Sequence, residues 1–313
     1  MNLRVHAVRC EARDVMTIEL GDPDRAALPP FTAGSHLELY LGNGLIRHYS
    51  LYNDPREADR YCIGVGLARD SRGGSRLIHE TVRVGQILKV SAPRNNFPLV
   101  PGAEAVVFIA GGIGITPIMS MIRVCIAEAR PWTLHYCARN RARAGFYEEL
   151  AALGPESVRF HFDDEQQGRF FDSGAVLAAA PKQAQVYTCG PAPLMQAVAA
   201  AGAGRPAEHM HFEWFAAAGR DDSADRAFTI RLVQSGREFT IPSGSSILDV
   251  LESAGVDVPY SCREGLCGTC RIGVVAGDCD HRDSVLSPTE KAENRSILPC
   301  VSRARSPMLE LDI

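Results

Sequence analysis

Residues 261–270 read SCREGLCGTC and place Cys262, Cys267 and Cys270 in one short loop. A further cysteine, Cys300, follows in the segment LPCV at residues 298–301. Cysteines at the spacing Cys-x4-Cys-x2-Cys, with one remote partner, form the plant-type [2Fe–2S] pattern. Four thiolates must converge on two irons, so the pattern predicts a cluster held by one tight loop and one distant segment.

The cluster interpretation has competitors. A structural zinc site usually pairs its cysteines as two short Cys-x2–4-Cys hooks, and cysteines can also simply fill an apolar core. Cys279 competes with Cys300 for the fourth position, but Cys279 follows Gly277-Asp278 in an expected turn, whereas Cys300 closes an apolar run. We therefore expect a cluster with Cys300 as its fourth ligand. Gly265 and Gly268 fit, because a backbone that wraps a cluster needs positive φ angles and close approach.

Length and composition describe a globular protein with more than one domain. The chain has 313 residues, 46% hydrophobic and 22% charged, with a formal net charge of −4 and no basic block, which argues against nucleic acid as a partner. Four of the ten cysteines are assigned to the cluster, and the others stand in apolar stretches where buried thiols are common. No segment has the apolar length of a signal peptide or a membrane span. We expect a soluble, cytoplasmic protein without a membrane partner, and a monomer as the default.

The first expected domain covers residues 1–101. Short runs that alternate apolar and polar residues, such as residues 36–41 and 61–65, predict an antiparallel β-barrel or sandwich of about six strands. One short helix is expected at residues 76–81. Turn residues separate these runs.

Two stretches of this domain contain candidate ligand-binding residues. The strand RHYS starts at Arg47, and alternation sends Arg47 and Tyr49 to one face, and His48 and Ser50 to the other. A guanidinium offers donors to a phosphate, and a tyrosine ring can stack on a planar ligand. The segment RGGSR at residues 72–76 places two glycines, a hydroxyl and two cations before the short helix, as anion sites do. An ordinary surface strand would also give the first pattern, and an ordinary Gly-Gly turn would also give the second.

The spacing of apolar residues changes in the second expected domain, residues 102–215. An apolar run at residues 105–110 predicts a fully buried parallel strand, followed by the loop GGIGITP at residues 111–117 and a helix. Strands and helices then alternate, which predicts a doubly wound α/β sheet. Ligands of such sheets bind beyond the carboxyl ends of the strands, where this loop and the segment TCGP at residues 188–191 both stand. The loop is not the dinucleotide fingerprint, because Pro117 replaces its third glycine.

The remaining chain divides into a linker and a third domain. Residues 216–227 are small and polar without periodicity, as linkers are. Residues 228–313 open with two alternating strands, a helix capped by Ser245 or Ser246, and the cysteine loop. The sequence thus predicts a multidomain chain with an antiparallel β-barrel, an α/β parallel sheet and a small α+β domain.

In this order the motifs resemble the family of phthalate dioxygenase reductase and vanillate demethylase reductase, flavoproteins with a C-terminal plant-type [2Fe–2S] ferredoxin domain. The resemblance covers essentially the whole chain. It rests on the Arg-x-Tyr-Ser strand, the Gly-Gly-Ser turn, the Gly-Gly-Ile-Gly-Ile-Thr-Pro loop, the Cys-Gly-Pro strand end and the cysteine loop. It implies that the first domain binds FMN, that the second binds NAD, and that the third is a β-grasp ferredoxin.

The resemblance also implies roles for single residues. Ser50, Thr116 and Cys189 would form the hydride-transfer centre, where Cys189 would position the nicotinamide rather than act as a nucleophile. Phe215 would cover the flavin, with Trp214 adjacent to it. The implied cofactor-binding residues are Arg47, His48, Tyr49, Ser50, Ile63, Val65, Gly73, Gly74, Ser75, Gly112, Gly114, Thr116, Cys189, Gly190, Pro191 and Phe215, and the implied cluster ligands are Cys262, Cys267, Cys270 and Cys300.

Electron transfer is the implied activity. A hydride delivers two electrons at once, whereas a [2Fe–2S] cluster accepts one, so a flavin must stand between them. The resemblance implies FMN, because relatives with this domain order use the mononucleotide, and a Rieske-type terminal oxygenase as a transient partner. NADH is favoured, although the arginines in RNRAR at residues 139–143 keep NADPH open. A redox-sensing or regulatory protein and a self-contained flavin reductase are the alternative functions.

Overall fold

The computed structural model describes residues 1–68, 73–165, 170–215 and 225–313. It divides the chain into two compact units, Met1–Phe215 and Ala216–Ile313, which are described separately. Arg72 and most of the predicted linker, residues 216–224, lie outside the described residues. Within the described ranges, the structure contains no helix with the length and apolar character needed to cross a membrane.

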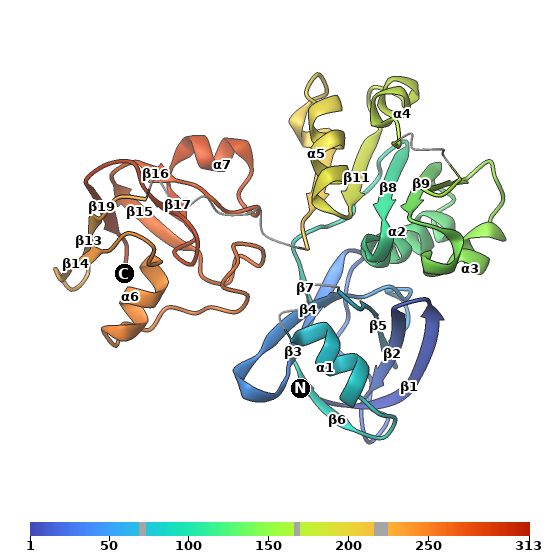
Figure 1. The fold of residues 1–313 in the computed structure, drawn as a ribbon, viewed down its shortest axis with the longest axis horizontal. Helices are drawn as coiled ribbons and strands as arrows, with labels where there is room; N and C mark the ends of the chain where they lie inside the picture. Colours follow the sequence, from blue (N-terminus) through green and yellow to red (C-terminus); the bar gives the residue numbers. More distant parts are fainter. Residues whose placement is uncertain (69–72, 166–169, 216–224) are drawn as a thin grey trace. The chain divides into compact units, whose positions relative to one another are not determined.

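An antiparallel sheet forms the first half of the larger unit (Figure 1). Its elements are β1 (Asn2–Ala12), β2 (Val15–Gly21), β3 (Ser35–Tyr40), β4 (Ile46–Ser50), β5 (Tyr61–Gly66), β6 (Ile87–Val90) and β7 (Arg94–Asn95), with η1 (Gly42–Gly44) and helix α1 (Gly74–Thr81). The strand order is β4-β3-β6-β1-β2-β5, with β7 beside β3. A bridge between Leu51 and Ile63 links the chain after β4 to β5, so the sheet curls toward a barrel around an aliphatic core. This confirms the predicted antiparallel domain; β7 was not expected because two residues show no alternation.

A parallel sheet forms the second half of the larger unit, as predicted. Its strands are β8 (Val106–Gly111), β9 (Trp132–Ala138), β10 (Val158–Phe162), β11 (Gln185–Cys189) and β12 (Met210–Glu213), in the order β10-β9-β8-β11-β12. One face packs against α2 (Ile115–Ala127) and α3 (Tyr147–Ala151), and the other against α4 (Ser173–Ala179) and α5 (Ala192–Ala201). The connecting turns are η2 (Gly112–Gly114), η3 (Arg141–Arg143) and η4 (Ala207–His209). The order reverses between β8 and β11, so their carboxyl ends form the crevice where such sheets bind ligands.

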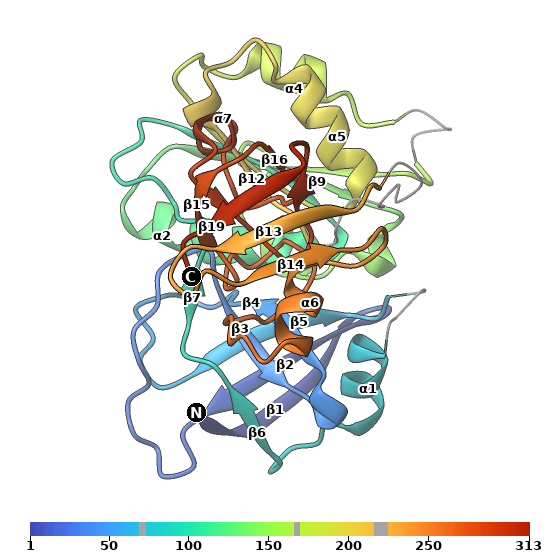
Figure 2. The ribbon, with the colours of Figure 1, turned by 90° about the vertical axis from the view of Figure 1, so that its left-hand side faces the viewer.

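The smaller unit is a mixed sheet with a helix packed on it (Figure 2). Its strands are β13 (Phe228–Leu232), β14 (Glu238–Ile241), β15 (Ile272–Ala276), β16 (Cys279–Asp280), β17 (Ser296–Ile297), β18 (Arg303–Ala304) and β19 (Met308–Leu311), and its helices are α6 (Ile247–Ser253) and α7 (Pro288–Glu293). The main sheet has the order β14-β13-β19-β15-β17, and β16 pairs with β18. Of the two predicted caps of α6, Ser246 is the one whose hydroxyl accepts the amide of Asp249, at 3.0 Å. The predicted β-grasp architecture is confirmed.

A buried ion pair fixes the chain that precedes β13. The Asp225 side chain is 2% exposed, and its carboxylate pairs with Arg282 at 2.7 Å and Arg303 at 3.3 Å. Arg303 also donates to the carbonyl groups of Arg226 and Pro242, each at 3.0 Å. Two guanidinium groups compensate one buried carboxylate, so the end of the predicted linker is held by the smaller unit.

Candidate functional site

Two pairs of cysteines meet between α6, β15 and the chain after β17. Cys270 Sγ and Cys300 Sγ lie 3.3 Å apart, and a hydrogen bond from the Cys262 thiol lowers the pKa of Cys267 to about 5. In the described parts of the chain, no group of three or more metal-binding side chains converges on a single ion. Two pairs of thiols suit a cluster of two irons with two sulfur ligands each, whereas a zinc site needs four ligands around one ion.

The cysteine loop turns its amide groups toward the sulfurs. The amide of Glu264 donates to Cys262 Sγ at 3.3 Å, and the amide of Gly265 donates to the Cys300 thiol. The φ angles are +69° at Gly265 and +73° at Gly268, as the sequence indicated. Such N–H donors stabilise charge on thiolate sulfur and tune an iron–sulfur centre, so this loop provides more than ligands.

Cys279 stands apart from the two pairs. Its amide donates to Asn294 Oδ1 at 3.1 Å, and burial, followed by the charge of Asp278, raises the pKa of its thiol to about 11. Arg305 is the other charged group that acts on this thiol. The geometry therefore favours Cys300 over Cys279 as the partner of the loop cysteines.

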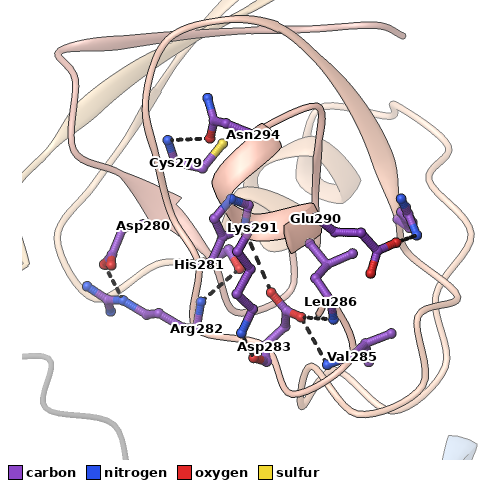
Figure 3. A network of polar contacts seen from close by, with 12 residues as sticks. Cys279, Asp280, His281, Arg282, Asp283, Val285, Leu286, Glu290, Lys291 and Asn294 are labelled. Atoms are coloured by element: carbon purple, nitrogen blue, oxygen red, sulfur yellow. Dashed lines mark hydrogen bonds and ion pairs between the residues drawn. The ribbon is translucent and has the colours of Figure 1, made fainter. Parts of the chain in front are cut away.

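A buried polar network supports the cysteine loop (Figure 3). The Asp283 side chain is 0% exposed, and its carboxylate accepts the amides of residues 285 and 286 at 3.0 and 2.7 Å. Lys291 Nζ donates to the carbonyl of Asp283 at 2.5 Å, and the amide of Ser284 donates to the carbonyl of Gly265 at 3.0 Å. These bonds tie the loop to α7 and limit its movement.

Glycines allow the carboxyl ends of β8 and β11 to touch. A Cβ on Gly114 would lie 2.3 Å from the carbonyl oxygen of Cys189, and one on Gly190 would lie 2.9 Å from Gly111 Cα. Gly112 has a φ of +53° and no atom within 4 Å of a Cβ position. Gly114 thus serves close packing, whereas Gly112 leaves backbone accessible to a ligand.

Thr116 lies where the two halves of the larger unit meet. Its methyl carbon would be 2.7 Å from a Cβ on Gly64 of β5, and its hydroxyl donates to the carbonyl of Ile113 at 3.0 Å. The neighbours of Gly64 in β5 are Ile63 and Val65, both buried. The strand expected to line the flavin and the loop expected to receive the nicotinamide are therefore in contact here.

The buried carboxyl group of Glu213 also lies at this junction. Ser50 Oγ donates to Glu213 Oε2 at 3.5 Å, and the register of β11 and β12 places Glu213 opposite Cys189. Burial raises the pKa of Glu213 to about 8, with the Ser50 hydroxyl opposing the shift. Burial, aided by the charge of Glu213, raises the pKa of Cys189 well above its usual value. A protonated thiol suits the predicted positioning role of Cys189 rather than a nucleophilic one.

Arg47 lies against the first turn of α1. A Cβ on Gly74 would be 2.6 Å from Arg47 Cγ and Nε, and Gly73 has a φ of +92° with open space around it. Ser75 Oγ accepts the amide of Ala68 at 3.2 Å. The structure thus brings the Arg-x-Tyr-Ser strand and the Gly-Gly-Ser turn together at a helix N-terminus, where free amides and a guanidinium suit a phosphate.

The other predicted flavin residues divide between two faces. Tyr49 is paired with Leu37 and packs on the barrel core, whereas His48 lies on the opposite face of β4 and stacks on His36 with ring centroids 5.1 Å apart. This is the alternation that the sequence predicted. Phe215, the last residue of the larger unit, has a side chain 40% exposed.

A cavity of about 450 Å³ lies at the carboxyl ends of β9 and β10. Asp163 supplies a carboxylate there, and the Phe170 ring is 94% exposed. Two of the arginines that suggested a 2′-phosphate site are engaged elsewhere: Arg141 pairs with Glu148 at 3.0 Å, and Arg143 pairs with Asp14. The cavity is lined by Cys137, His161, Asp163, Phe170, Phe171, Asp172, Ala175 and Val176.

Comparison with known proteins identifies two domains of this chain and its family. The model of the 2Fe-2S iron-sulfur cluster binding domain matches residues 230–305, and that of the oxidoreductase NAD-binding domain matches residues 108–200. The chain is 42% identical to vanillate O-demethylase oxidoreductase from Pseudomonas sp. (strain HR199 / DSM 7063), over 99% of this chain and 98% of that protein. It is 40% identical to phthalate dioxygenase reductase from Burkholderia cepacia, over 100% of this chain and 97% of that protein. The chain belongs to the phthalate dioxygenase reductase family.

A solved structure of phthalate dioxygenase reductase, described as a modular structure for electron transfer from pyridine nucleotides to [2Fe–2S], extends the likeness to the fold. It matches with a TM-score of 0.74 at 40% identity, covering 100% of this chain and 98% of that one. The family therefore confirms the predicted enzyme class: an oxidoreductase with a flavin-binding reductase fold, an NAD-binding domain and a [2Fe–2S] domain. Which residue touches which cofactor stays a prediction.

The sequence did not reveal three groups of this site. Glu213 stands in FEWF, which reads as an ordinary strand end, and only its burial sets it apart. Asp163 stands among other acidic residues in a turn and gave no signal. Asp283, followed by a serine and two apolar residues, could have been recognised as a side chain that caps a turn.

Proposed function

We propose that this chain is the reductase component of an oxygenase system and passes electrons from NADH through FMN and a [2Fe–2S] cluster to a Rieske-type terminal oxygenase. The two thiol pairs, in one chain with an NAD-binding domain, carry this proposal. They supply a one-electron outlet for a two-electron donor. The oxygenase partner is supported by the names of the relatives, which include a phthalate dioxygenase reductase and a vanillate O-demethylase oxidoreductase.

In this proposal the three domains divide the work. Residues 1–101 bind FMN, residues 102–215 bind NADH, and residues 228–313 carry the cluster. Cys262 and Cys267 bind one iron, and Cys270 and Cys300 bind the other, with the amides of Glu264 and Gly265 directed at the sulfurs. The cluster, when bound, supplies a centre that takes up and releases single electrons.

FMN fits the cradle at α1. Arg47 closes over Gly74, and Gly73 keeps a positive φ beside open space, so one compact anion such as the phosphate of a mononucleotide is suited to this turn. Tyr49, Ser50 and the backbone of residues 63–65 are proposed to hold the ring and its chain. The flavin supplies conversion between hydride and single-electron chemistry, and the residues around it supply position.

The nicotinamide is proposed to lie at the crevice between β8 and β11. Gly112 offers open backbone there, Thr116 separates the flavin strand from the loop, and Cys189 with Gly190 and Pro191 shapes the pocket. The Cys189 thiol stays neutral, so it can pack against an uncharged ring without adding charge.

Glu213→Gln should remove a pH dependence from flavin reduction by NADH. The Glu213 carboxyl is neutral below its pKa of about 8 and becomes an anion above it. A carboxylate beside a group that gains negative charge opposes that gain, so the wild-type rate should fall as pH rises through 8. Stopped-flow traces from pH 6 to about 9.5 would measure this, and the variant should give a flat profile over the same range. A step retained in Glu213→Gln would assign the titration to another group.

NADH rather than NADPH is the proposed donor. Adenosine fits the cavity after β9 and β10, with Phe170 available to stack on the purine and Asp163 available to accept a ribose hydroxyl. A carboxylate at that position repels a 2′-phosphate. The pairing of Arg141 and Arg143 with carboxylates supports the same choice.

Asp163→Asn should shift the preference toward NADPH. The expected gain in kcat/KM for NADPH relative to NADH is about fivefold, because an exposed charge contributes up to about 1 kcal/mol. Asp164→Asn is the matched control, since Asp164 adjoins Asp163 in the same turn but does not line the cavity. Equal shifts in both variants would point to a general effect of net charge rather than to this site.

Anaerobic titration with NADH tests the proposed function directly. The purified protein should release FMN on extraction, its flavin and cluster absorbance bands should both bleach, and the reduced protein should give a low-temperature [2Fe–2S] EPR signal. Transfer from NADH to a purified Rieske-type oxygenase then tests the partner. A flavin that NADH does not reduce, or zinc in place of iron, would contradict the proposal.

A further inference from the structure

The proposed electron route leaves one proton to be removed. NADH supplies a hydride, which is two electrons and one proton, whereas the [2Fe–2S] cluster accepts one electron in each of two successive steps and no proton. For each NADH oxidised to NAD⁺, one proton must therefore pass from the flavin site to the solvent. The inference below rests on the proposed function and concerns the side chains that carry this proton.

The face of β3 and β4 that points away from the barrel core carries a row of titratable side chains. The register pairs His36 with Ser50 and Glu38 with His48. The amide of Leu51 donates to the carbonyl of residue 35 at 2.8 Å, so the pairs His36–Ser50 and Glu38–His48 are of the non-hydrogen-bonded kind. Side chains of such pairs approach each other most closely in an antiparallel sheet. The row therefore runs from Ser50 through His36 to His48.

One end of this row meets the buried carboxyl group. Ser50 is 3% exposed, and its hydroxyl donates to Glu213 at 3.5 Å. Because Ser50 faces both Glu213 and His36, its hydroxyl can donate to one and accept from the other. The hydroxyl is thus placed to pass a proton between the hydride-transfer site and the row.

His36 has the features of a proton carrier rather than of a packed ring. His36 is 5% exposed, and no described residue provides a hydrogen-bond partner for its Nε2. Burial, followed by the nearby ring of His48, lowers the pKa of His36 to about 4. A neutral imidazole can accept a proton on one nitrogen and release another proton from the other nitrogen.

The groups around His36 define the outer end of the row. The Glu38 carboxylate accepts hydrogen bonds from Tyr40 at 2.9 Å and from Arg94 at 2.8 Å. The Arg94 side chain is 46% exposed and His48 is half-buried, so this end is open to solvent. Glu38 favours a cation on His36 and Arg94 opposes it, but burial is the largest influence on the pKa of His36 and keeps the imidazole neutral at rest.

We propose that Ser50, Glu213, His36 and His48 form a proton exit route, in which one proton for each NADH oxidised passes from the flavin site through the Ser50–Glu213 pair to His36 and leaves through His48. Electrons take the separate path to the cluster. The balance closes with one proton released to water and two electrons accepted for each NADH. Packing alone gives no reason for a buried ring nitrogen without a partner, because an apolar ring would avoid the desolvation cost.

His36→Phe tests the route, because phenylalanine keeps a stacked ring but carries no proton. The holoprotein is reduced with NADH without oxygen and mixed with ferricyanide, which accepts electrons only, in weak buffer with a pH-indicator dye. Proton release in the wild type should keep pace with recovery of the flavin band. In His36→Phe, proton release and flavin recovery should slow by about 100-fold, within the range of a lost proton-transfer group.

Two further measurements separate a route from a structural role. The flavin midpoint potential of His36→Phe should equal that of the wild type, because a route changes the rate of proton transfer and not the proton affinity. His6→Gln, an exposed histidine on β1 outside the row, should release protons at the wild-type rate. If His36→Phe fails to retain flavin, His48→Phe carries the same expectation.

Contrary results are equally clear. Wild-type proton release in His36→Phe or in His48→Phe, or an equal slowing in His6→Gln, would overturn the route. A changed midpoint potential without a slower proton step would assign His36 a structural role. If NADH does not reduce the flavin of the wild type, the proposed function fails and the route fails with it. If NADH reduces the flavin normally and His36→Phe releases protons at the wild-type rate, the route alone fails.

Discussion

Cys300→Ser should abolish electron delivery while leaving flavin reduction intact. The variant removes one sulfur of the Cys270–Cys300 pair, so one iron of the cluster would lose a proposed ligand. Outer-shell changes at metal sites cost roughly 10–100-fold, and a lost ligand should cost more. Cytochrome c reduction with NADH should therefore fall to the background rate, and the [2Fe–2S] EPR signal should disappear. Bleaching of the flavin by NADH should proceed at the wild-type rate, because the proposed flavin and NAD sites lie in the other unit.

Cys279→Ala is the matched control for this variant. Cys279 is as buried as Cys300 and lies in the same unit, but it belongs to neither thiol pair. Its variant should retain the EPR signal and the transfer rate, with some loss of stability from the smaller side chain. The reverse result, a cluster retained in Cys300→Ser and lost in Cys279→Ala, would refute the proposed ligand set.

Gly114→Ala should impair hydride transfer more than any surface change in the larger unit. The new Cβ would lie 2.3 Å from the carbonyl oxygen of Cys189 and 2.5 Å from its carbonyl carbon, and backbone cannot rotate away as a side chain can. The ends of β8 and β11 must move apart, at a cost of about 1–3 kcal/mol in stability. A displacement of about 1 Å at a reacting pair can cost about 100-fold in rate. Stopped-flow reduction of the flavin by NADH measures the loss.

A glycine in open space provides the control for Gly114→Ala. A Cβ on Gly204, between α5 and η4, would meet no atom within 4 Å. Gly204→Ala should reduce the flavin at the wild-type rate and melt at or slightly above the wild-type temperature, because alanine restricts the unfolded chain. Normal hydride transfer in Gly114→Ala would show that the contact between strand ends does not position the nicotinamide.

Local patterns in the sequence were enough to predict the fold class and the family of the protein. The spacing of Cys262, Cys267 and Cys270 is a property of one loop, and it predicted the cluster because three ligands of a plant-type site fit within ten residues. The change from alternating strands to a buried apolar strand at residue 105 predicted the change from an antiparallel to a parallel sheet. The order of the motifs then gave the family, which the full-length relatives confirm.

Tertiary structure decided what depends on distant segments. The sequence favoured Cys300 over Cys279 only by its apolar context, and the fold places Cys300 Sγ 3.3 Å from Cys270 Sγ. Glu213 and Ser50 are 163 positions apart, and their contact, like the raised pKa of Glu213, arises from burial that no local pattern encodes. His36 likewise became notable only through strand register and burial. Ligand spacing is set by local backbone geometry, whereas burial and proton affinity are set by everything that packs around a group, and a sequence determines these only through the complete fold.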